Sequence, residues 1–252
     1  MATPPRVIGL ITYQAPHLKT EQVLLRLRQK PYAFRLYALP FKPRKPREVR
    51  FAHRPPQHDA VPPHELAERH GIPYRACDRD TDIDGGCDLY LILGANLLSP
   101  EGVAGKRILN CHPGILPAVR GLDAFKWAVL EMKPLGVTLH YIDARVDAGE
   151  IVAVVGTDVY ASDTLGTLAR RHYENEVDCL VRFDEFLLRP VNAFRGLPVD
   201  EPRRRMPLDV EARMEAAFPA YRDRYGRPDP PFARARSGGA TGGGGAGGLG
   251  NA

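Results

Sequence analysis

Two short apolar runs constrain the fold of this chain more than any other feature. "VIGLITY" at 7–13 and "DLYLILG" at 88–94 are almost wholly apolar, so neither offers a face that can turn toward water. Strands that are buried on both faces have this composition, and they occur in parallel sheets covered by helices. The two runs therefore predict a mostly parallel sheet with helices on both of its faces.

The rest of the chain alternates between strand-like and helix-like patterns. Further strands are expected at 32–41, 106–111, 136–142 and 150–160, and helices at 20–27, 63–71, 122–132 and 163–187. Thr20 and Asp163 can cap the first and last of these helices. Alternation of this kind places the chain in the α/β class, with a twisted, mostly parallel sheet.

Composition changes toward the C-terminus predict three regions. We expect an α/β domain over residues 1–190, followed at 191–235 by a polar, Pro-rich extension with one weak helix. That extension either forms a dimer contact or covers the sheet. Residues 236–252 are mostly glycine and cannot bury enough surface to fold, so we expect a disordered tail. The basic, Pro-rich segment 42–63 is long enough to suggest a functional loop.

Charge and cysteine content exclude several classes of protein. The net charge is +5, but no stripe of aromatic and basic residues accompanies it, so we expect attraction of a small anionic substrate rather than nucleic acid. No apolar run approaches the ~20 residues of a membrane span. Four cysteines without a CxxC pair, and no secretory signal, predict a cytoplasmic protein with reduced thiols.

A metal site is not expected either. "DTDIDGG" at 80–86 fills only the first half of a calcium loop, because the twelfth position is Leu91 and not a glutamate. His58, His64 and His70 are six residues apart, a spacing that does not place them on one helix face.

The stretch "NCHPGILPAVRG" at 110–121 contains the candidate catalytic residues. Asn110 and His112 lie two residues apart at a strand end, so their side chains point to the same face. An amide and an imidazole can both donate to the oxyanion of an acyl-transfer reaction, and the Asp147 carboxylate, about 35 residues on, can orient the imidazole. The alternative is structural: a loop with a capping asparagine and a core histidine.

Together with "GVTLHYIDARVDAGEIV", this stretch resembles the folate-dependent formyltransferase family over about residues 88–155. The positions that fall on the family pattern are Asn110, His112, Pro113, Leu116, Pro117, Gly121, His140 and Asp147. The resemblance implies a Rossmann-like, formyltransferase-type α/β core that uses 10-formyltetrahydrofolate as co-substrate and no metal.

The resemblance also implies residue roles. Asn110 would donate to the formyl oxygen, His112 would stabilise its charge and move protons, and Asp147 would hold His112. The pterin pocket would comprise Asn96, Leu97, Leu98, Ile142, Asp143, Ala144 and Val146. The acceptor is expected near the first strand end and the 42–63 segment, where Tyr13, Gln14, His17 and Lys19 lie.

Departures from the family pattern reduce the number of possible acceptor substrates. Gly114 stands where the purine and tRNA enzymes usually have serine, and "YQAPHLKT" replaces the purine enzyme's Gly/Ser-rich phosphate loop. About sixty residues follow the core, many of them glycine, which argues against the tRNA enzyme's C-terminal barrel. The first strand at residue 7 argues against the hydrolase's N-terminal regulatory domain.

The expected acceptor is therefore a small biosynthetic amine, with an amino sugar of a surface glycan as the leading interpretation. A hydroxylamine or amino acid of a siderophore or antibiotic comes second. Two other hypotheses stay open: hydrolysis of 10-formyltetrahydrofolate, and a non-catalytic binding module.

Overall fold

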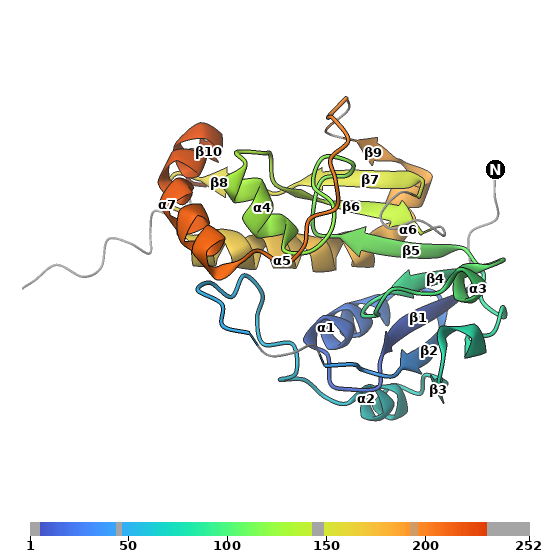
Figure 1. Ribbon diagram of the computed structural model, residues 1–252. Coiled ribbons are helices and arrows are strands. Elements are labelled where there is room, and N and C mark those ends of the chain that lie inside the picture. Colours follow the sequence, from blue (N-terminus) through green and yellow to red (C-terminus); the bar gives the residue numbers. More distant parts are fainter. Residues whose placement is uncertain (1–5, 44–46, 143–148, 193, 195, 231–252) are drawn as a thin grey trace, which may run out of the picture.

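The computed structural model describes residues 6–43, 47–142, 149–192, 194 and 196–230, and within them an eight-stranded sheet in the order β3-β2-β1-β4-β5-β6-β7-β9 (Figure 1). The strands are β1 (Val7–Tyr13), β2 (Ala33–Leu39), β3 (Tyr74–Ala76), β4 (Leu89–Ile92), β5 (Ile108–His112), β6 (Gly136–Tyr141), β7 (Ile151–Gly156) and β9 (Val191–Asn192). All neighbouring pairs are parallel except those made by β6, which runs antiparallel to β5 and β7. The predicted mostly parallel sheet is confirmed.

Helices and a short 3₁₀ turn cover both faces of this sheet. They are α1 (Leu18–Leu27), α2 (Pro63–Arg69), η1 (Asp80–Asp82), α3 (Pro100–Val103), α4 (Ala124–Leu130), α5 (Leu165–Val181), α6 (Phe183–Leu188) and α7 (Leu208–Tyr225). Along β1, Ile8 and Leu10 pack into the core shared with α1, α2, α5 and α6, whereas Ile11 packs into the opposite cluster with η1 and α3. This burial on both faces explains why the strand carries so few polar residues.

The C-terminal extension forms a substantial helix. The sequence suggested only a weak helix, but α7 has 18 residues and packs along α4, with Met214, Phe218 and Tyr221 buried (Figure 1). Its apolar residues recur every three or four positions among charged ones, so the helix is stabilised by tertiary packing and not by its own average hydrophobicity. The short strands β8 (Val159–Tyr160) and β10 (Gly226–Arg227) pair beside it.

Two predicted helix starts were wrong. Helix α1 begins at Leu18, and Thr20 lies inside it with its hydroxyl 2.5 Å from that of Thr12. The long helix expected at 163–187 is divided into α5 and α6, and Thr164 caps α5 by accepting from the Thr167 amide. Asp163 instead binds Arg171. Thr20 therefore makes a tertiary contact with β1, and Asp163 makes an ion pair with a residue two turns along α5, in place of the predicted caps.

In the part of the chain that the structure describes, no helix is both long and apolar enough to cross a membrane. Nor do the described residues contain a group of three or more His, Cys, Asp or Glu side chains arranged to hold a metal ion. In the acidic stretch at 80–86, Asp80 accepts from the amide and hydroxyl of Ser99. The tail expected at 236–252 lies outside the described residues, and the domain boundaries stay predictions.

Candidate active site

The candidate site lies at the carboxyl ends of β1, β4 and β5. The strand order changes direction between β1 and β4, and in open α/β sheets ligands bind at the carboxyl ends beside such a switch point. The loops after β1 and β4 meet there: a Cβ atom added to Gly94 would lie 2.7 Å from the His17 ring and 2.9 Å from that of Tyr13. The fold thus brings three of the predicted loops to one edge.

Asn110 is oriented by a histidine on the neighbouring strand. The two residues are paired in the β5–β6 register, and the Asn110 Nδ2 atom lies 3.3 Å from Nε2 of His140. His140 Nδ1 lies 3.0 Å from the carbonyl oxygen of Tyr141, which can only accept, so Nδ1 carries the proton and Nε2 accepts from Asn110. One amide hydrogen is thereby fixed, and the second can be directed at a substrate oxygen.

His112 is held in one tautomer by the loop that follows it. Its Nε2 atom lies 2.9 Å from the backbone carbonyl oxygen of Val119, so Nε2 donates. The ring is buried, and the strand places it on the same face as Asn110, as the spacing predicted.

The loop after His112 is packed too tightly for a side chain at position 114. A Cβ atom there would lie 2.5 Å from the Val119 carbonyl oxygen and 2.9 Å from His112 Nε2, which explains glycine at this position. Thr138 on β6 donates to the Gly114 carbonyl over 2.8 Å and accepts from the Leu116 amide over 3.0 Å. The bond between Leu116 and Pro117 is cis.

His172 on α5 holds the start of the same loop in place. Its Nε2 donates to the Pro113 carbonyl over 3.2 Å, and its Nδ1 accepts from Thr157 over 2.9 Å. Burial lowers the pKa of His172 to about 4, so the ring is neutral at neutral pH. The sequence offered a signal for this residue: a polar side chain on the otherwise apolar stripe of an amphipathic helix.

The predicted carboxylate, Asp147, lies outside the described residues, as do Asp143, Ala144 and Val146. The residues on either side of this segment are held together, because the Tyr141 amide donates to the Glu150 carbonyl over 2.8 Å. Gly149 packs so closely against Tyr141 that a Cβ atom would collide with its carbonyl oxygen. The role of Asp147 stays a prediction.

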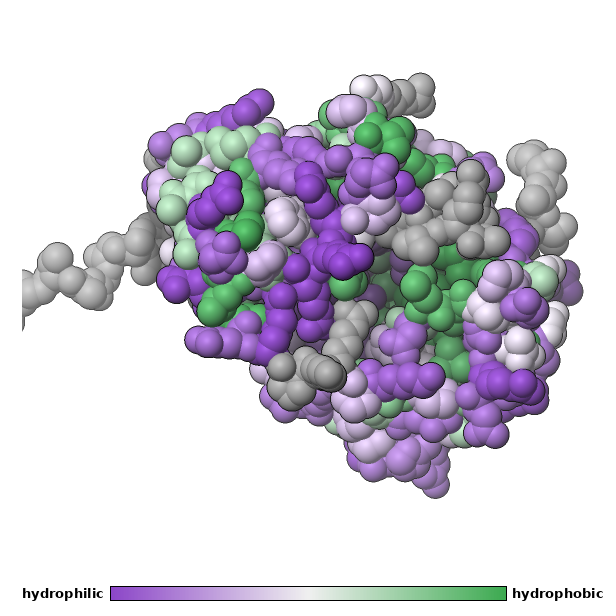
Figure 2. All heavy atoms as spheres, in the orientation of Figure 1, coloured by the Kyte–Doolittle hydropathy of each residue, from purple (hydrophilic) through white to green (hydrophobic). Residues whose placement is uncertain are grey.

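Two residues of the predicted pterin pocket lie on the same side of the sheet. Leu98 and Ile142 both pack, partly exposed, against the cluster that contains Ile11 and Tyr90. Leu97 is 78% exposed, and Asn96 is also exposed. Figure 2 shows apolar side chains gathered on this face over β4 and β5. An open apolar surface at a strand end suits a flat heterocycle.

Some of the residues predicted to bind the acceptor substrate make hydrogen bonds within the protein. The Gln14 amide donates to the carbonyls of Ala38 and Cys77 over 3.3 and 3.0 Å. Lys19 is buried, and its ammonium donates to Glu176 over 2.9 Å. Tyr13 is partly exposed and lies edge-on to the ring of His17. Gln14 is exposed and Tyr13 partly exposed, whereas Lys19 is buried, and the role of all three in binding the acceptor stays a prediction.

Sequence reasoning missed the charged cluster beside the site. Glu176 of α5 is buried and binds both Lys19 of α1 and Arg54 of the loop at 47–61. Burial alone would raise its pKa, but the Arg54 and Lys19 charges outweigh burial and lower the pKa of Glu176 to about 2. The loop is therefore folded onto the domain through a buried ionic contact.

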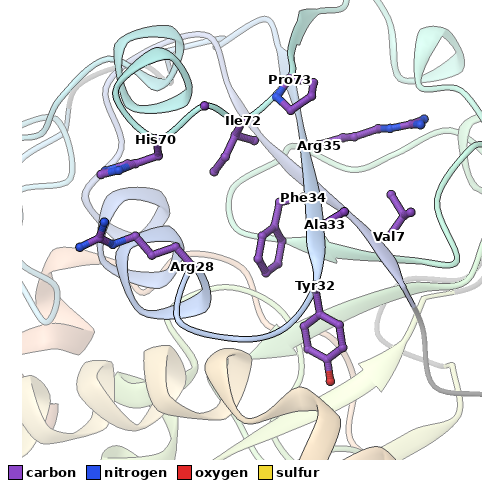
Figure 3. A pocket seen from close by; sticks show the side chains of 10 residues that line it. Val7, Arg28, Tyr32, Ala33, Phe34, Arg35, His70, Ile72 and Pro73 are labelled. Carbon is purple, nitrogen blue, oxygen red and sulfur yellow. The ribbon is translucent and has the colours of Figure 1, made fainter.

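A well-formed cavity lies elsewhere. About 390 Å³ in volume, it sits at the amino-terminal ends of β1 and β2, where Val7 and Ala33 line it (Figure 3). Arg28 and His70 approach it from one side (Figure 3). Because Asn110 and His112 lie at a carboxyl end, this cavity is not part of the candidate active site.

The oriented amide and the single-tautomer imidazole thus lie together on one strand of a mixed α/β sheet. Residues 89–183 match the family described as "Formyl transferase". A phosphoribosylglycinamide formyltransferase of Bacillus subtilis (strain 168) is 38% identical over 86 residues, 34% of this chain and 43% of that protein. The match spans less than half of the relative's length. Over residues 89–183, the chain is therefore similar to the formyl transferase family.

Two solved structures share the fold. Glycinamide ribonucleotide transformylase 1 from Symbiobacterium toebii superposes with a TM-score of 0.54 at 22% identity, covering 72% of this chain and 86% of that one. A sugar N-formyltransferase from Shewanella sp FDAARGOS_354 gives a TM-score of 0.52 at 12% identity, covering 84% of this chain and 87% of that one. The formyltransferase-type α/β core expected from the sequence is confirmed.

Proposed function

We propose that the protein transfers a formyl group from 10-formyltetrahydrofolate to the amine of a small metabolite, an amino sugar in our leading interpretation. The observation that carries the proposal is the Asn110–His140 contact, because it fixes the amide while leaving one N–H able to reach a carbonyl oxygen. His112 on the same strand face supplies a second polar group.

The two side chains have complementary roles in this reaction. As the amine nitrogen bonds to the formyl carbon, negative charge develops on the formyl oxygen, and the Asn110 N–H donates to it. The proton lost by the amine passes to the His112 ring, which the Val119 carbonyl orients through Nε2–H. When the bond from the formyl carbon to the folate nitrogen breaks, the imidazolium can return that proton. We expect Asp147 to stabilise the charged ring.

The described part of the folate pocket that we propose is mainly apolar. Leu98 and Ile142 would contact the flat ring system, with Leu97 completing the apolar surface. The co-substrate supplies the activated formyl group. None of the residues assigned here requires a metal ion.

The experiment is an assay of tetrahydrofolate release with a panel of amines: free and nucleotide-linked amino sugars, hydroxyornithine and glycinamide ribonucleotide. Release that depends on one amine supports the transferase and identifies the acceptor. Equal release without any amine would replace the proposal with formyl-folate hydrolysis. Tight folate binding without release would replace it with a binding module.

A further inference from the structure

The loop at 47–61 is fixed by carboxylates from three helices. Glu21 of α1 accepts from the Val61 amide over 2.8 Å, and Glu176 of α5 binds Arg54. Glu211 of α7 accepts from the Arg50 amide over 2.6 Å and from the Phe51 amide over 3.3 Å. These contacts hold the loop against the domain, so it is an ordered wall beside the site.

Glu211 is itself a buried anchor. Its carboxylate is 0% exposed and lies 2.7 Å from the ammonium of Lys126, whose side chain is 2% exposed. An ion pair this deeply buried tolerates little displacement, because either partner left alone would be a buried charge. Helix α7, which lies outside the residues that match the family, thus fixes the position of the loop.

The loop presents two adjacent side chains, His53 and Arg54, next to the catalytic strand. The His53 ring stacks on Phe125 with ring centres 5.9 Å apart and planes 4° apart, and Phe125 in turn contacts the ring of His172, which binds the Pro113 carbonyl. His53 is partly exposed, and its ring nitrogens make no hydrogen bond to any described residue. One face of this ring is packed, and its nitrogens have no hydrogen-bond partner among the described residues. The ring is therefore suited to bind a ligand.

Arg54 also has N–H donors that make no hydrogen bond to the described residues. Its side chain is 29% exposed, and its guanidinium carbon lies 5.7 Å from the centre of the Tyr173 ring. Among the described residues only Nη2 has a hydrogen-bond partner, the Glu176 carboxylate. The guanidinium fork carries five N–H donors, so most of them can serve a ligand. Two cations, Lys19 and Arg54, surround the single Glu176 charge, which leaves one positive charge in excess at this point.

We propose that His53 and Arg54 form the acceptor-binding subsite and that the acceptor is an amine bearing a phosphate or carboxylate group. The fork of Arg54 binds the anionic oxygens, and His53 hydrogen-bonds a neighbouring oxygen. His172 and Glu176 are four residues apart on α5, so the anionic group binds about one helical turn (~5.4 Å) along α5 from the reacting end. The inference rests on the proposed function for the identity of the ligand as acceptor.

The test combines kinetics with a binding measurement that needs no turnover. Arg54→Gln should raise the KM for an anionic amine acceptor about tenfold or more, with kcat and the folate Kd within twofold, since a hydrogen bond to a charged group is lost. Arg54→Lys should recover part of this loss. His53→Phe keeps the stacking on Phe125 and should raise the same KM. Arg50→Gln, on the exposed side of the loop, is the matched control and should behave as the wild type.

Inorganic phosphate serves as the probe of the subsite. At constant ionic strength it should raise the Tm of the wild type and of Arg50→Gln, but not that of Arg54→Gln or His53→Phe. Equal shifts in all four proteins, or none in any, would overturn the subsite. If wild-type protein releases no tetrahydrofolate with any amine, the proposed function fails, whereas the phosphate result still decides the anion site. Preference for uncharged amines by an active wild type would refute the acceptor class alone.

Discussion

His112 donates from Nε2 to the backbone carbonyl of Val119 over 2.9 Å, and that carbonyl lies in a loop that the C-terminal extension holds in place. The Arg203 amide donates to the Arg120 carbonyl over 3.0 Å, and the Leu122 amide donates to the Arg203 carbonyl over 2.8 Å. The orientation of a central imidazole therefore depends on contacts to a segment about ninety residues away in the sequence.

The oriented amide gives the first prediction. Asn110→Ala should lower kcat on the order of 10²–10³-fold, because one donor to the developing oxyanion is lost, while the folate Kd stays within twofold. Steady-state kinetics and folate titration measure the two quantities. Asn192→Ala, in the edge strand β9, is the control. Full turnover by Asn110→Ala would remove the proposed oxyanion role.

Position 114 provides a steric prediction. Gly114→Ser introduces the serine that the family resemblance led us to expect, yet here its Cβ would lie 2.5 Å from the Val119 carbonyl oxygen. The loop must shift, so we expect a lower Tm and a fall in kcat of about tenfold or more, as misplaced reacting groups lose rate steeply. Gly166→Ala in α5 is the control, since its Cβ would meet nothing closer than 3.7 Å. Unchanged kcat in Gly114→Ser would show that the loop adapts without moving His112.

The buried pair between α4 and α7 predicts a large loss of stability. Glu211→Ala leaves the Lys126 ammonium buried without its partner, which should lower the free energy of unfolding by about 3–5 kcal/mol in urea denaturation. Glu215→Ala, which removes a partly exposed partner of Arg50, should change it by less than ~1 kcal/mol. A double variant, Lys126→Met with Glu211→Met, should recover much of the loss. If Glu211→Ala and Glu215→Ala lowered the free energy of unfolding equally, the buried ion pair would not be the source of the stability.

Acid sensitivity follows from His172. An unfolded histidine binds a proton near pH 6.5, whereas burial lowers the pKa of folded His172 to about 4, so between these values the unfolded chain binds more protons. Stability must then fall as the pH is lowered through this window, by roughly 2 kcal/mol between pH 7 and pH 5 for this group. Urea titrations of the wild type and His172→Gln should differ in pH slope, while the exposed His64→Gln should keep the wild-type slope. A wild-type slope in His172→Gln would disprove the attribution.

Much of the fold was predictable because it depends on local patterns. Continuous apolar runs predicted the buried strands β1 and β4, and alternation with helical segments predicted the parallel sheet. The helix starts were less predictable, since Thr20 contacts Thr12 of β1 and Asp163 pairs with Arg171 of α5, in place of the predicted caps. Helix α7 was underestimated because its stability comes from packing on α4, which no local property of its sequence records.

By itself, the sequence determined the α/β class, the strand that carries Asn110 and His112, and their common face, because strand periodicity is a local property. Only the tertiary structure decided which partners those side chains have: His140 for Asn110, the Val119 carbonyl for His112, and the neighbouring loop that presents His53 and Arg54. Hydrogen bonds and buried ion pairs join residues that are distant along the chain, so their pairing is set by how the elements pack and not by the spacing of residues.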